Sequence, residues 1–181
     1  MSGSSVHAKA SLLFQDDDHI IGLDTAAITL VAYCDFECPY CGRAYPVIKR
    51  LQASLKDHLR FVFRHFPLIQ NIPLLNRRPK PLKLRAHKDS FGPCTICSLK
   101  NQDALGERDL EGYAGALGLD TARFKDELRR KLYAARVGED VRRGRQSGVT
   151  GTPTFFINGS RHTDEDTLER LILGVSQRRS A

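Results

Sequence analysis

Two cysteines separated by two residues are the part of this sequence best suited to chemistry. Cys38 and Cys41 lie between an apolar run at residues 28–33 and a helix-like run at residues 47–51. Their spacing puts both sulfurs on one face of a first helical turn, close enough to form a disulfide. A helix N-terminus favours negative charge, so Cys38 is predicted to have a lowered pKa and to be the attacking sulfur. Cys41, one turn deeper, would resolve the mixed disulfide, which indicates thiol–disulfide redox chemistry rather than two cysteines that merely pack.

The elements that must hold this pair follow from the pattern of apolar residues. Residues 28–33 are short, apolar and rich in β-forming residues, as in a central strand covered on both faces. Residues 60–66 alternate with a period of two and predict a second strand, which Pro67 ends. Pro39 falls at the first position of the helix after Cys38, where its missing N–H removes no hydrogen bond. The sequence thus predicts a strand that leads into the cysteines at a helix start.

The second half of the chain predicts helices followed by a hairpin. Apolar residues with helical spacing predict three helices, at residues 110–117, 124–132 and 136–147. Asp120 or Thr121 is expected to cap the second of them. Residues 154–157 predict a strand, Asn158-Gly159 a hairpin turn into a further strand, and residues 167–175 a closing amphipathic helix.

Composition limits the classes of protein that this chain can be. Its 181 residues, 41% of them hydrophobic, suit one globular domain. The net charge is +7, but residues 69–100 hold seven basic residues against one aspartate, so one segment makes the chain basic and nucleic acid is not an expected partner. Residues 1–10 carry no apolar leader and no apolar run reaches membrane-spanning length, so a soluble, cytoplasmic protein is expected.

Three stretches and the order of the elements resemble the DsbA-like family of thioredoxin-fold oxidoreductases. The stretches are residues 35–41, 63–68 and 147–159. The resemblance implies an α/β structure, the thioredoxin fold with a helical insertion, and the sequence of the first part of that insertion predicts an irregular segment. The chain is thus divided into a polar N-terminal arm, a thioredoxin-like domain, an insertion within that domain and a tail, at residues 1–18, 19–176, about 69–136 and 177–181.

The same resemblance implies a function and a set of site residues. The expected activity is protein thiol–disulfide exchange through a Cys-Pro-Tyr-Cys motif, with no bound cofactor and no metal. A cis-proline is expected to face the cysteines, and the residue before it to pair with an extended substrate through its backbone. The expected partners are protein thiols or disulfides, with glutathione or a thioredoxin-type reductant, and neither nucleic acid nor a membrane. The implied site residues are Cys38, Pro39, Tyr40, Cys41, Thr152 and Pro153.

Two features near the motif leave alternatives open. Members of this fold commonly carry a buried carboxylate six residues before the attacking cysteine, where this chain has Ala32. Proton transfer to or from Cys41 would then need another group or water. Cys34 is expected to be a small, buried apolar side chain. The alternatives to an active enzyme are a thioredoxin-fold binding module and a catalytically impaired product of a frameshifted gene.

The frameshift hypothesis concerns residues 71–99, which hold four prolines and show no helical or strand period. Codons permitted for this stretch, regrouped in the neighbouring frame, give an alanine- and glutamate-rich helix that resembles the missing part of the insertion. The gene's nucleotide sequence tests this directly. On this hypothesis Cys94 and Cys97 are accidents of translation and not half of a zinc site, and residues 70–100 are expected to be irregular and mobile.

Overall fold

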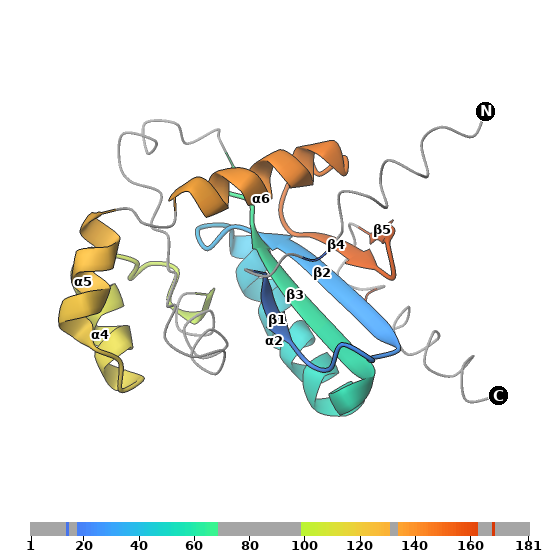
Figure 1. The fold of residues 1–181 in the computed structure, drawn as a ribbon, viewed down its shortest axis with the longest axis horizontal. Coiled ribbons are helices and arrows are strands. Elements are labelled where there is room, and N and C mark those ends of the chain that lie inside the picture. Colours follow the sequence, from blue (N-terminus) through green and yellow to red (C-terminus); the bar gives the residue numbers. More distant parts are fainter. Residues whose placement is uncertain (1–13, 15–17, 69–98, 131–133, 163–167, 169–181) are drawn as a thin grey trace.

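A computed structural model of the chain describes residues 14, 18–68, 99–130, 134–162 and 168, and contains a five-stranded mixed sheet with helices on both faces (Figure 1). The strands are β1 (His19–Ile21), β2 (Ile28–Cys34), β3 (Leu59–His65), β4 (Thr154–Ile157) and β5 (Ser160–His162). The helices are α2 (Pro39–Leu55), α4 (Glu107–Ala116), α5 (Thr121–Arg129) and α6 (Ala134–Gln146), with a 3-10 turn η1 (Lys56–His58) after α2.

The sheet has the strand order β1-β3-β2-β4-β5. The parallel pair β2 and β3 lies at its centre, joined through α2, and β4 runs antiparallel to β2. The short strands β1 and β5 pair antiparallel with β3 and β4 at the two edges. This β-α-β unit followed by a β-hairpin confirms the predicted thioredoxin fold.

The central strand β2 is buried on both faces, as its apolar run predicts. Leu30 and Ala32 face the cluster that contains the buried side of α2, while Val31 and Tyr33 face the cluster that contains Val141 of α6. The alternation follows from the two-residue period of a strand. Helices α2 and α6 therefore cover opposite faces of the sheet, and α4 and α5 pack on each other beside it (Figure 1).

Most predicted elements are present with small shifts at their ends. Asp120 is the N-cap of α5 and accepts a hydrogen bond from the Arg123 amide at 3.0 Å, as expected of a capping aspartate. Strand β1 was not predicted, because three residues carry too little pattern. The predicted closing helix lies outside the described residues except for Leu168, which is helical and buried against the α2 cluster.

The structure differs from the sequence-based expectation at the boundaries of two segments, the polar arm and the segment expected to be irregular. Asp18 was assigned to the polar arm, but its side chain is fully buried between Arg64 and Arg136. The segment expected to be irregular lies outside the described residues up to residue 98, and the frameshift hypothesis stays a prediction. Its last residues do not follow the expectation, because Leu99 and Lys100 are helical and Leu99 is buried.

Within the ranges given above, none of the helices combines the length and the apolar character needed to cross a membrane.

Candidate active site

The motif begins where β2 ends and α2 starts. Cys38 is the N-cap of α2 with an extended backbone, and Pro39 occupies the first helical turn, where its fixed φ suits a helix start. The connecting turn is closed by a hydrogen bond from the Cys38 amide to the Asp35 carbonyl at 3.2 Å. The Asp35 carboxylate accepts hydrogen bonds from the amides of Glu37 and Leu68, both at 3.0 Å. The strand thus delivers both cysteines to the helix N-terminus through a fixed turn.

The structure brings the two cysteines together with the loop before β4. Both are free thiols, Cys38 is 7% exposed and Cys41 1% exposed. The Cys38 thiol donates a hydrogen bond to the Thr152 carbonyl oxygen at 3.3 Å, and the Thr152–Pro153 peptide bond is cis, as the resemblance implies. The Thr152 backbone and the attacking cysteine therefore lie at one place, where an extended substrate could pair with the loop.

Tyr40 and Pro39, between the cysteines, lie on the surface. The Tyr40 side chain is 55% exposed, and the Arg43 guanidinium lies 4.3 Å from its ring centroid. This exposed aromatic ring beside Cys38 offers an apolar contact for a bound polypeptide.

The electrostatics of the two sulfurs differ from the prediction made from the helix N-terminus. Burial raises the pKa of Cys38, and interactions with the Thr152 side chain and with the Cys41 and Tyr40 amides offset this only in part. A hydrogen bond from Cys34 lowers the pKa of Cys41 despite its burial. The expected lowering at Cys38 is therefore wrong for this dithiol form, because desolvation of the sulfur outweighs the helix N-terminus.

Cys34 is the site residue that sequence reasoning did not assign. It is buried, as expected, at 2% exposure, and it belongs to the same buried cluster as Cys38 and Cys41, where it affects the pKa of Cys41. The two-residue period of β2 carried a signal, since Cys34 follows Ala32 on the strand face that turns toward α2.

Gln102 is a second missed residue, and it comes from the insertion. Its side-chain amide donates hydrogen bonds to the carbonyl oxygens of Phe36 and Cys38, both at 2.8 Å. A Cβ atom on Gly42 would lie 2.5 Å from the Gln102 side-chain oxygen, so the glutamine packs directly over the motif helix. No local pattern predicts this contact, because 64 residues separate Gln102 from Cys38.

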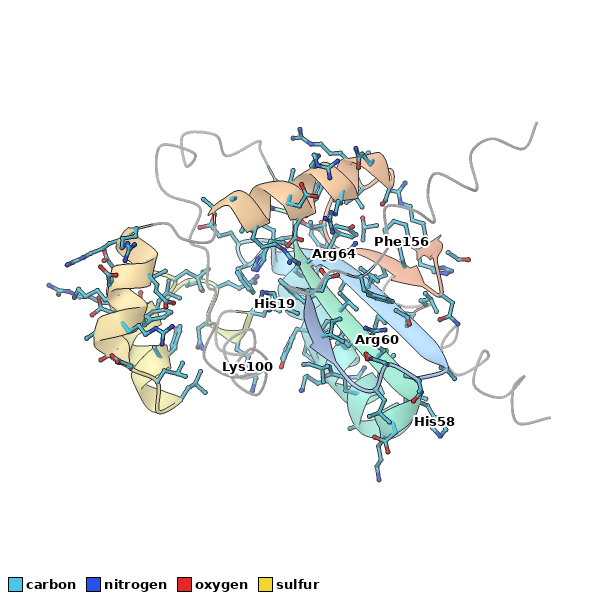
Figure 2. All side chains as sticks on the ribbon, in the orientation of Figure 1. His19, His58, Arg60, Arg64, Lys100 and Phe156 are labelled. Carbon is cyan, nitrogen blue, oxygen red and sulfur yellow. The ribbon has the colours of Figure 1, made fainter. Side chains whose placement is uncertain are left out.

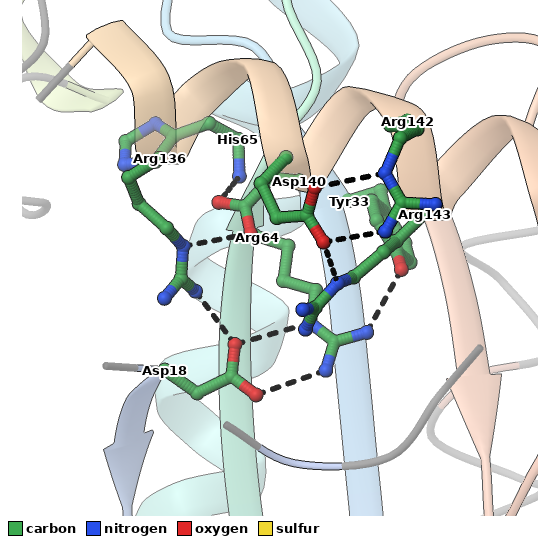
Figure 3. A network of polar contacts seen from close by, with 9 residues as sticks. Asp18, Tyr33, Arg64, His65, Arg136, Asp140, Arg142 and Arg143 are labelled. Carbon is green, nitrogen blue, oxygen red and sulfur yellow. Dashed lines mark hydrogen bonds and ion pairs between the residues drawn. The ribbon is translucent and has the colours of Figure 1, made fainter. Parts of the chain in front are cut away.

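On the α6 face of the sheet, a buried polar network joins three elements (Figure 3). Asp18 pairs with Arg64 at 2.9 Å and with Arg136 at 2.7 Å, and Arg136 also pairs with Asp140 at 2.9 Å. Arg64 donates to the Tyr33 hydroxyl at 2.9 Å. The Arg64 side chain lies where β3 passes α6 (Figure 2), on the sheet face away from α2, so the network stabilises the fold and does not reach the cysteines.

In the part of the chain that the structure describes, no three His, Cys, Asp or Glu side chains converge in a way that could hold a metal ion. Cys94 and Cys97 lie outside that part.

Comparison with protein families gives a match over residues 15–173 to a model described as thioredoxin. Among curated proteins, the chain is 38% identical over 160 residues to the Na(+)/H(+) antiporter NhaA 3 of Salinispora tropica. That alignment covers 88% of this chain and 24% of the antiporter. The chain thus spans about a quarter of the length of this curated relative.

Solved structures share the fold at low sequence identity. Oxidised BdbD from Bacillus subtilis has a TM-score of 0.76 at 17% identity, covering 91% of this chain and 94% of that one. The α-DsbA1 protein of Wolbachia pipientis has a TM-score of 0.70 at 18% identity, with 94% of each chain covered. These similarities agree with the DsbA-like architecture predicted from the sequence landmarks.

The predicted cytoplasmic location is contradicted by these neighbours. They include a periplasmic thioredoxin-like protein from Salmonella enterica serovar Typhimurium, with a TM-score of 0.68 at 17% identity over 93% of this chain and 95% of that one. That neighbour is described as periplasmic, and the fold it shares with this chain therefore does not support the cytoplasmic expectation. The prediction failed because it relied on residues 1–10, whereas a thioredoxin fold serves oxidising compartments equally well.

Proposed function

The chain belongs to the thioredoxin family and has the fold of the DsbA-like thiol–disulfide oxidoreductases, and we propose that it exchanges disulfides with protein dithiols through Cys38-Pro39-Tyr40-Cys41. The observation that carries the proposal is the convergence of two free thiols with the Thr152 carbonyl and the cis bond to Pro153. No bound cofactor is needed, because the electrons move between sulfur atoms.

The bonds and electrons of the proposed exchange balance between the cysteine pair and the substrate sulfurs. When the pair is oxidised, a substrate thiolate attacks Cys38, forms a mixed disulfide and releases Cys41 as a thiolate. A second substrate thiolate then attacks the substrate sulfur and releases Cys38, so the substrate loses two electrons and the pair gains them. In the reverse direction Cys38 attacks a substrate disulfide, and Cys41 attacks Cys38 and releases the reduced substrate.

Substrate docking would use the loop before β4. We propose that an extended substrate segment pairs with the Thr152 backbone next to Pro153, while exposed Tyr40 contacts its side chains. The Cys38 sulfur lies 3.3 Å from the Thr152 carbonyl oxygen. A substrate segment that pairs with the Thr152 backbone would therefore bring its own sulfur next to the attacking sulfur. Protein thiols or disulfides are the proposed partners, and glutathione or a thioredoxin-type protein the proposed reductant.

We further propose that the protein acts in a periplasm-like compartment, on the model of its periplasmic structural neighbour. Disulfides form and persist in such oxidising compartments. The proposed catalytic domain begins at Asp18 rather than residue 19, because Asp18 is buried in the polar network. It extends to about residue 176 and includes the insertion at about 69–136.

A trapping experiment tests the proposal. In a chain whose Cys94 and Cys97 are changed to Ser, Cys41→Ala should accumulate mixed disulfides with a reducible protein such as insulin, because the resolving thiol is missing. Non-reducing gels and mass spectrometry would locate the bond at Cys38. The matched control is the same chain with Cys38→Ala in addition, which should trap nothing.

The alternative functions make a different prediction for the same assay. A thioredoxin-fold binding module, or a catalytically impaired gene product, would form no mixed disulfide through Cys38 and would not accelerate insulin reduction. Absence of both signals in folded protein would overturn the enzymatic proposal.

A further inference from the structure

The turn that carries Gln102 is fixed by buried leucines on both sides. Leu99 belongs to the buried cluster that contains both motif cysteines, and Leu105 belongs to the cluster formed by α4 and α5. Phe36, in the turn that leads from β2 to the motif, packs against both clusters. Gln102 therefore lies where the helical insertion meets the start of α2.

The side-chain amide of Gln102 has two N–H groups, and both are used on the motif. Its nitrogen Nε2 lies 2.8 Å from the Phe36 carbonyl oxygen and 2.8 Å from the Cys38 carbonyl oxygen. The Cys38 carbonyl also accepts the Gly42 amide at 3.2 Å, the hydrogen bond that opens α2. Two lone pairs allow a carbonyl oxygen to accept both donors. The glutamine thus joins the turn before α2 to the first turn of the helix.

Gly42 leaves the space that this contact needs. A Cβ atom on Gly42 would lie 2.5 Å from the Gln102 side-chain oxygen and 3.3 Å from Nε2, and its three nearest neighbours would all be atoms of that side chain. These distances are shorter than a packed carbon tolerates. A larger residue at position 42 would therefore push the glutamine amide off the two carbonyl oxygens.

The bridge bears on the chemistry because disulfide formation depends on how the two sulfurs are held. Reacting groups fixed near their productive geometry behave as if at a high effective concentration. Gln102 holds the backbone of Cys38, whose sulfur lies 3.3 Å from the Thr152 carbonyl oxygen. Without the bridge, the first turn would sample more conformations, and the Cys38 sulfur would meet that of Cys41 less often.

We propose that Gln102 is a positioning residue for the cysteine pair, whose amide holds the Cys38 backbone and so favours closure of the Cys38–Cys41 disulfide. The inference rests on the proposed function, because it concerns the same two sulfurs. Closure of the disulfide can nevertheless be measured with glutathione alone, without a protein substrate.

Equilibration with glutathione tests the proposal in full-length protein with Cys94 and Cys97 changed to Ser. Glutathione disulfide takes two electrons and two protons from the two thiols, which leaves the Cys38–Cys41 disulfide and two molecules of glutathione. Alkylation of the remaining thiols and mass spectrometry give the equilibrium constant. We expect Gln102→Ala to lower this constant by about three- to tenfold, the range that corresponds to the net loss of one hydrogen bond.

A second substitution disturbs the bridge from the other side. Gly42→Ala should displace the Gln102 amide and lower the same constant, and the double variant should lose no more than the weaker of the two single variants. Tyr113→Phe is the matched control, since the Tyr113 hydroxyl donates to the Ala104 carbonyl oxygen at 3.0 Å, within the insertion and away from the motif. It should leave the glutathione equilibrium unchanged. If Gln102→Ala does not fold, Gln102→Met replaces it, because methionine keeps an unbranched side chain without the amide.

An equilibrium constant that the Gln102 variant leaves unchanged or raises would overturn the inference, and so would additive losses in the double variant. A merely structural role of Gln102 would lower the unfolding midpoint in urea and leave the equilibrium constant in place. If the constant falls as expected but no mixed disulfide forms in the trapping experiment, the proposed function fails while the positioning role of Gln102 stands.

Discussion

At the scale of single residues, the surroundings of the two cysteines favour ionisation of Cys41 over ionisation of Cys38. Burial raises the pKa of Cys38, whereas Cys41 receives hydrogen bonds and has a lowered pKa. The helix N-terminus alone would predict the reverse order. In the dithiol form the resolving sulfur is thus the one prepared for ionisation. A substrate that displaces the Cys38 thiol from the Thr152 carbonyl would change the environment of the attacking sulfur.

Gln102 offers a residue-scale prediction, because its amide bridges the Phe36 and Cys38 carbonyl oxygens. We expect Gln102→Ala to lower the free energy of unfolding by about 1–2 kcal/mol through loss of two partly buried hydrogen bonds. The isosteric Gln102→Glu should cost more, since it turns carboxylate oxygens toward two carbonyl oxygens. Urea unfolding of the reduced protein measures both. A Glu variant as stable as wild type would show that the bridge contributes nothing.

At the scale of elements, strong local patterns were read correctly and long-range contacts were not. The strand at residues 28–34 follows from its apolar run, the strand at residues 59–65 from alternation, and the hairpin at Asn158-Gly159 from turn chemistry, and all three are local properties. The contact of Gln102 with the motif and the burial of Asp18 depend on residues far away in the sequence, so no local pattern encodes them. Of the candidate site residues, Cys38 and Cys41 could be proposed from a compact local motif, whereas Thr152 and Pro153 were proposed only through the family resemblance.

Helix α6 provides an element-scale prediction through two of its glycines. A Cβ on Gly144 would lie 2.7 Å from Cδ2 of Phe66 and 3.0 Å from Cε1 of Tyr33, so glycine is what lets α6 approach the sheet. We expect Gly144→Ala to destabilise the protein by about 1–3 kcal/mol, although alanine is the better helix former.

The matched control is Gly138→Ala in the same helix. Gly138 is exposed and a Cβ there meets nothing within 4 Å, so this change should stabilise the protein by about 0.5–1 kcal/mol. The free energies of unfolding of both variants, measured in urea, separate the effect of close packing at residue 144 from the effect of helix propensity. Equal effects of the two substitutions would contradict the close contact at Gly144.

At the scale of the whole molecule, the polar network joins the residue before β1, the central strands and α6 into one unit. Asp18, Arg64 and Arg136 come from segments far apart in the sequence, and all three side chains are nearly inaccessible to solvent. Buried ion pairs of this kind add little net stability, but removing one partner is costly. The same unit matches about a quarter of the length of the antiporter relative, which is consistent with a domain that has its own core.

The network makes stability depend on pH through Asp140. Burial raises its pKa to about 6, although Arg136 and the His65 amide act in the opposite direction, whereas the ordinary value is 3.8. Between these values the folded state binds the proton more tightly than the unfolded state, so Asp140 stabilises the fold below about pH 4, and this contribution is lost as the pH rises through about 6. Asp140→Asn cannot ionise and keeps an acceptor for the His65 amide. The unfolding free energy of wild type relative to Asp140→Asn should therefore fall by about 1 kcal/mol from pH 5 to pH 7.

Glu139→Gln is the control in the same helix, because hydrogen bonds and ion pairs with Arg142 and Arg143 hold the pKa of Glu139 at about 2, below this range. Its difference from wild type should stay nearly constant in the same urea series. A constant difference for Asp140→Asn as well would mean that Asp140 is already ionised throughout, with its charge fully compensated by Arg136.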